Sequence, residues 1–106
     1  MGNWKDSNLN LGEAYDYVEF TLTTGQTDYD VKANQASLFS NIPFAGIVVI
    51  ETTVNISVRF NRTAFPAVKL DAGASPMELA RKLYVKNIFL TNASGSSSTM
   101  RIWLFV

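Results

Sequence analysis

The chain has 106 residues, which is enough for one domain with its own core and too few for two. Nine basic and nine acidic residues cancel, which argues against nucleic acid or a membrane surface as a partner, because both attract clustered Lys and Arg. The sequence has no Cys and no His, which excludes thiolate nucleophiles, disulfides, Cys-based zinc sites and His-dependent triads. The longest apolar run, residues 44–50, is far shorter than the roughly 18 residues that span a bilayer, so we expect a soluble protein.

The first residues differ from the rest of the chain, because they are polar, contain three Asn and follow no sustained period. We expect a flexible N-terminal arm over residues 1–13 and a single β domain over residues 14–106. Trp4, Leu9 and Leu11 are apolar residues of this arm, and they indicate docking on this subunit or on a neighbour. A plain disordered terminus fits the sequence equally well.

Alternation of apolar and polar residues predicts strands in the first half of the domain. Residues 15–24 alternate and are rich in aromatic, β-branched and Thr residues, and a turn follows over residues 25–28. Residues 29–39 are less regular. Residues 47–53 form an apolar run typical of a strand covered on both faces, and residues 54–60 alternate most clearly. Because no turn residue separates these two runs, one long bent strand and two strands both fit.

The second half also reads as short strands between turns. Residues 67–70 predict a short strand. Residues 75–78 fit a capping box, with Ser at the N-cap and Pro at the first helical position, although alternation after the Pro also fits a strand. Residues 83–91 and 99–106 predict two strands, and the polar loop between them favours a hairpin. This pattern predicts an all-β fold, either a single antiparallel β-sandwich or a small jelly-roll-like barrel.

The last strand carries large apolar residues on both of its faces. If Ile102 and Leu104 face the core, Trp103 and Phe105 lie on the opposite face, beside Arg101. Large aromatics on a face that should meet solvent indicate a covered surface, and we interpret it as an assembly interface. The alternative is that a loop or the N-terminal arm covers them within one subunit.

No catalytic or metal-binding constellation stands out in the sequence. Asp28 and Asp30 would share one face of a strand, but the further oxygen ligands that a hard cation needs are missing. Neither a Ser-x-x-Lys dyad nor a Gly-rich phosphate loop is present. We therefore predict no enzyme activity, no cofactor, no metal and no small-molecule substrate. A sugar-stacking platform is a weaker interpretation of the aromatic residues Trp4, Tyr15, Tyr17, Tyr29 and Trp103.

Four segments of the second half resemble small β-sandwich structural proteins of tailed bacteriophages. They are Val58-Arg59-Phe60-Asn61-Arg62-Thr63, Val68-Lys69-Leu70-Asp71-Ala72-Gly73, Val85-Lys86-Asn87-Ile88-Phe89-Leu90-Thr91-Asn92-Ala93-Ser94-Gly95 and Arg101-Ile102-Trp103-Leu104-Phe105. The resemblance covers about half of the chain, from Val54 to the end, and rests on the order and spacing of these segments. It implies framework roles for the matching positions, with Gly73 and Gly95 in turns and Asn92 in the hairpin.

The resemblance implies a non-enzymatic virion protein, most simply a capsid decoration (cement) protein that stabilises the particle through subunit contacts. The expected partner is the major capsid protein or another virion protein, in a homotrimer, on a virion assembled in the host cytoplasm. The alternative is a tail or baseplate accessory, or a fibre module that binds carbohydrate or a host surface. We expect the interface to include Trp4, Leu9, Leu11, Ile42, Phe44, Trp103 and Phe105.

Overall fold

Successive side chains of a strand point to opposite sides of its sheet, so each sheet can bury the apolar residues of one side and leave the other side open to solvent. The computed structural model describes residues 15–106, except for the side chains of residues 80–83. The strands of this part are β1 Tyr15–Leu22, β2 Tyr29–Asp30, β3 Ala45–Glu51, β4 Ile56–Phe60, β5 Val68–Leu70, β6 Met77–Val85, β7 Ile88–Thr91 and β8 Ser98–Phe105. A short helix α1 (Val31–Asn34) follows β2, and a 3-10 turn η2 (Ala72–Ala74) follows β5.

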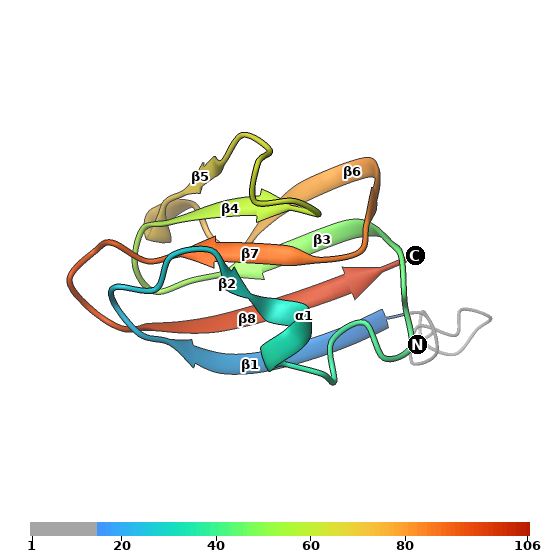
Figure 1. Ribbon diagram of the computed structural model, residues 1–106, viewed down its shortest axis with the longest axis horizontal. Coiled ribbons are helices and arrows are strands. Elements are labelled where there is room, and N and C mark those ends of the chain that lie inside the picture. Colours follow the sequence, from blue (N-terminus) through green and yellow to red (C-terminus); the bar gives the residue numbers. More distant parts are fainter. Residues whose placement is uncertain (1–14) are drawn as a thin grey trace.

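Within residues 15–106 the strands form two antiparallel sheets of four (Figure 1). The β1 sheet has the order β1-β8-β3-β6, and the β2 sheet has the order β2-β7-β4-β5. The pairs β1–β8, β2–β7, β3–β6 and β4–β5 are nested, as if one long hairpin had been rolled up so that β8 also meets β3 and β7 also meets β4. This is the jelly-roll arrangement of a β-sandwich. The all-β sandwich prediction is confirmed.

The core lies between the inner faces of the two sheets. In β8 every second residue is buried, from Ser98 through Ile102 to Leu104, and Val58 and Leu90 face them from the β2 sheet. These apolar side chains are fully buried, and their burial supplies most of the driving force for folding. The same alternation turns Tyr15 and Tyr17 of β1, and Trp103 and Phe105 of β8, outward, whereas the partly buried Phe20 packs against the core.

Residues 31–44 connect the two sheets and pack along the edge of the sandwich that β1 and β2 form. Leu38, Phe39 and Ile42 of this connection are buried in the common core. The carboxylate of Asp16 in β1 is itself buried and accepts hydrogen bonds from the backbone N–H of Asn41, at 3.0 Å, and of Ile42, at 2.8 Å. The connection is therefore fixed to the β1 sheet by a charge-assisted contact as well as by packing.

One local prediction is wrong, because distant partners decide the conformation. The strands β7 and β8 do not form a hairpin, since β7 lies in the β2 sheet and β8 in the β1 sheet. The buried Asn92 amide instead donates to Leu22 O, at 3.0 Å, and thereby ties the connecting loop to β1. The choice left open after Pro76 is resolved in favour of the strand, because Met77 begins β6, which pairs with β3. The Ser75 hydroxyl donates to Thr52 O instead.

Residues 47–60 form two strands, which resolves the choice that the sequence leaves open. The break falls at residues 52–55, where the chain leaves the β1 sheet after β3 and enters the β2 sheet at β4. Thr52 donates to Val54 O at 2.8 Å and lies 2.7 Å from the Ser98 hydroxyl, so the bend is held by buried hydroxyl groups. The predicted strand over residues 83–91 is likewise divided, between β6 and β7, at Lys86 and Asn87.

Candidate functional site

The outer side of the β1 sheet carries two rows of large apolar side chains. In one row Trp103 lies between Tyr17 of β1 and Val49 of β3. In the next row Phe105 lies between Tyr15 and Ile47. We call this surface the aromatic face, and it consists of Tyr15, Tyr17, Ile47, Val49, Trp103 and Phe105.

The aromatic rings of this face are paired across the strands and still reach solvent. The rings of Tyr17 and Trp103 have centroids 5.1 Å apart, and those of Tyr15 and Phe105 are stacked at 6.0 Å. The two tyrosines are 38% and 39% exposed, and both partners on β8 are half-buried. Beside Trp103 and Phe105 a shallow hollow of about 280 Å³ reaches Val49 and Pro76. The rings are thus held in place before any partner arrives.

A row of charges borders the aromatic face. Arg101 of β8 lies between Glu19 of β1, at 3.5 Å, and Glu51 of β3, at 3.4 Å. These carboxylates raise the pKa of the Arg101 guanidinium, Glu19 by its charge first and then Glu51 by a hydrogen bond and its charge. Because the groups lie in solvent, the row contributes little to stability. It does mark where the apolar part of the sheet ends.

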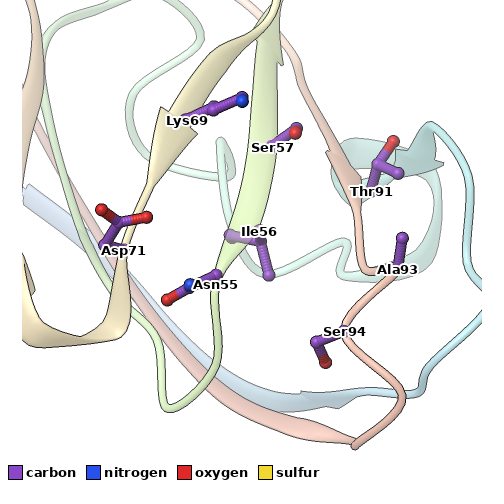
Figure 2. Close-up of a pocket in the computed structure, with 8 residues that line it drawn as sticks. All are labelled: Asn55, Ile56, Ser57, Lys69, Asp71, Thr91, Ala93 and Ser94. Carbon is purple, nitrogen blue, oxygen red and sulfur yellow. The ribbon is translucent and has the colours of Figure 1, made fainter.

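On the outer side of the β2 sheet Phe89 is flanked by the polar residues Asp30 and Arg59. A groove of about 450 Å³ lies on this side, and Figure 2 shows the residues that line it. Several of its polar groups already serve the fold: Asn55 accepts from Ala72 N at 2.9 Å, and Thr91 accepts from Asp28 N at 3.0 Å. No aromatic ring is among the described residues that line it. We therefore interpret this groove as a solvated surface. Its lining residues are Asn55, Ile56, Ser57, Lys69, Asp71, Thr91, Ala93 and Ser94.

The carboxylates of Asp28 and Asp30 have structural partners. Asp28 forms an ion pair with Arg59 at 2.8 Å, while Asp30 accepts from Ala33 N at 3.0 Å and so caps α1. Asn87 also donates to Asp30, at 3.0 Å. In the part of the chain that the structure describes, no three Asp, Glu, His or Cys residues are grouped so as to hold a metal ion. No helix among these residues is long and apolar enough to cross a membrane.

The structure distributes the expected interface residues over different places. Trp103 and Phe105 lie on the aromatic face, as the alternation of the last strand predicts. Phe44 is 55% exposed but lies just before β3, where it lines a separate cleft. Ile42 is 4% exposed and packs in the subunit's own core, so it offers no surface to a partner. The remaining three, Trp4, Leu9 and Leu11, lie outside the described residues.

The predicted interface omits four members of the aromatic face, although Tyr15 and Tyr17 are named with Trp103 as a sugar-stacking platform. In β1, Tyr15 and Tyr17 alternate with the buried Val18, so the alternation alone places them on the outer side of the sheet. Ile47 and Val49 are harder to assign, because they stand in an apolar run in which both faces look buried.

No protein-family model matches this chain, and no curated protein matches it. The jelly roll defines the class of architecture, but that architecture serves capsid proteins, lectins and enzymes alike. The function is therefore inferred from the surfaces of the domain.

Proposed function

We propose that the protein is a non-enzymatic virion component, a capsid decoration protein that works by contact through its aromatic face. The observation that carries this proposal is the outward placement of Trp103 and Phe105, flanked by Tyr15 and Tyr17, on a sheet whose inner side is already a complete core. An apolar outer surface of this kind is typical of a protein interface. The outer side of the opposite sheet supplies the contrast, because polar residues flank its aromatic residue Phe89 there.

The physical basis is the burial of apolar surface on association. Aromatic residues are enriched at interfaces because each removes a large area from water and loses little conformational freedom. The cross-strand pairing of these rings reduces that loss further, because they are already ordered in the free subunit. Contacts of this type between decoration subunits and the shell would raise the free energy of particle disassembly.

The specific role rests on the resemblance of residues 54–106 to phage β-sandwich proteins, together with the jelly roll, a fold common in viral capsids. We propose a homotrimer that binds the major capsid protein, with the N-terminal arm over residues 1–13 reaching a neighbouring subunit. A tail or baseplate accessory uses the same kind of contact and is the second location that fits this surface.

The experiment is the solution mass of the full chain by light scattering coupled to size exclusion, at low micromolar concentration. We expect a mass of about three subunits, and we expect Trp103→Ser and Phe105→Ser to yield monomers with unchanged circular dichroism. Phe65→Ser is the matched control, because Phe65 is 44% exposed but lies outside the aromatic face. A monomeric wild type contradicts the trimer, and association that survives both face variants contradicts the role of the aromatic face.

A further inference from the structure

A second exposed aromatic site lies at one end of the sandwich, where β4 and β6 end and β3 begins. It is a cleft of about 590 Å³ lined by Phe44, Asn61, Tyr84 and Lys86. None of the described residues that line it belongs to the aromatic face. Its volume falls within the range of small-ligand sites.

Two aromatic side chains form the apolar walls of the cleft. Tyr84 is 79% exposed and Phe44 is 55% exposed, which makes them the most exposed aromatic residues of the described chain. Their ring centroids lie 6.5 Å apart with an interplanar angle of 62°, so the two faces meet at an angle. Each ring is adjacent to a fully buried residue, Val85 or Ala45, and these two residues are paired across β3 and β6. The core therefore holds in place a pair of rings that the core itself does not cover.

Asn61 fixes the backbone beneath these side chains. Its amide Nδ2 donates to Tyr84 O at 2.9 Å, and its Oδ1 accepts from Lys86 N at 2.8 Å and from Asn87 N at 3.3 Å. Asn61 itself has a φ of 71°, in the left-handed region that non-glycine residues seldom occupy. Strained residues held by several contacts cluster at ligand sites, where they preorganise the binding groups.

The charge of the cleft selects among ligands. Lys86 is exposed and has no ion-pair partner among the described residues, and no carboxylate is among the residues that line the cleft. This charge disfavours a cationic guest between the rings and favours an anionic one. The π-faces of Tyr84 and Phe44 carry partial negative charge and attract the weakly positive C–H groups of a saturated ring. Both requirements are met by a pyranose that carries a carboxylate.

We propose that this cleft binds an acidic carbohydrate, with a sugar ring against Tyr84 and Phe44 and its carboxylate at Lys86. A protein partner would also find exposed rings here. The sugar is favoured because the site is a cleft of small-ligand size, with the exposed Lys86 beside two angled rings.

The experiment is a titration of the isotope-labelled full chain, followed by backbone amide NMR. The probes are sialyllactose, trigalacturonate and a hyaluronan tetrasaccharide, with lactose as the neutral control. We expect at least one acidic probe, and not lactose, to shift the amides of Tyr84 and Lys86 in a saturable way. The protein is used at about 1 mM and each sugar at up to about 20-fold molar excess, so that weak binding with a dissociation constant in the millimolar range is detected. If no acidic probe shifts these amides in a saturable way, the proposal is wrong.

Three variants assign the effect to its groups. Tyr84→Ser should weaken binding at least tenfold, and Lys86→Gln should abolish the preference for acidic over neutral sugars. Phe65→Ser, which removes an exposed ring that does not line the cleft, should leave the affinity unchanged. Binding that is insensitive to Tyr84→Ser overturns the proposal, as do amide shifts that follow protein concentration instead of sugar. Trp103→Ser separates the two functions, because it should disrupt association and leave sugar binding intact.

Discussion

Tyr17 and Trp103 lie opposite each other across β1 and β8, with ring centroids 5.1 Å apart, on the side of the sheet that faces away from the core. An antiparallel sheet in a sandwich usually keeps its outer side polar, because only the inner side has a partner. Here β1 and β8 carry on their outer side an aromatic contact that the core of the subunit does not need. The pair therefore contributes to the free energy of unfolding of the subunit, and in the proposed function it also contributes to association.

The contribution of this pair to folding can be measured by a double-mutant cycle. We expect Tyr17→Ala and Trp103→Ala to show a coupling free energy of about 0.5–1 kcal/mol in urea unfolding, the range of cross-strand aromatic pairs. The measurement belongs in dilute, monomeric protein, where association adds nothing. Tyr17→Ala combined with Phe89→Ala is the control, since Phe89 lies in β7 of the opposite sheet and should be additive with Tyr17. Additivity for Tyr17 and Trp103 as well would show that the rings are neighbours without a stabilising contact.

A second prediction concerns the connection over residues 31–44, which depends on one buried carboxylate. Asp16→Ala leaves the N–H groups of Asn41 and Ile42 without an acceptor. We expect it to lower the free energy of unfolding by about 2–4 kcal/mol, because buried donors lose a charged partner. Hydrogen exchange should accelerate at these two amides before it does in β8.

The matched control for this carboxylate is Asp71→Ala. Asp71 is exposed, and its side chain does not cap η2, the turn that follows it. We expect its loss to change the free energy of unfolding by less than about 0.5 kcal/mol. An equal loss of stability in the two variants would mean that net charge matters here and that the hydrogen bonds of Asp16 do not.

The strands could be predicted from the sequence where alternation is strict, and their partners could not. Residues 54–60 alternate clearly and contain β4, and the last strand places Trp103 outward as expected. The partner of each strand depends on contacts between residues far apart in the chain. The polar loop after β7 has the composition of a hairpin turn, yet it carries the chain from one sheet to the other, because β7 pairs with β2 and β4 and β8 pairs with β1 and β3.

The candidate surfaces could be predicted only in part for the same reason. The aromatic face combines residues of β1, β3 and β8, so its extent depends on the register between strands that are up to 90 positions apart, as Tyr15 and Phe105 are. Phe44 stands out in the sequence as a large residue before an apolar run, but its companion Tyr84 does not. The two meet because Ala45 and Val85 are paired in the sheet, and no local pattern encodes that pairing.

The last prediction compares two glycines that the sequence places equally in turns. Gly95, between β7 and β8, has a φ of +92°, whereas Gly73 in η2 lies outside the left-handed region. A Cβ at either position would meet no atom within 4 Å, so the backbone conformation alone distinguishes them. We expect Gly95→Ala to lower the free energy of unfolding by about 1–2 kcal/mol, because an L-residue is strained at positive φ.

Gly73→Ala should leave the free energy of unfolding unchanged or raise it by up to about 1 kcal/mol, since alanine restricts the unfolded chain without straining the folded one. Urea unfolding of both variants beside the wild type measures the difference directly. Equal stability of the two variants would contradict the left-handed turn at Gly95. That turn is needed for Gly95 N to reach the Thr24 hydroxyl, at 3.0 Å, and so to hold the loop against the end of β1. A destabilised Gly95→Ala variant with faster exchange at this amide is therefore the expected result.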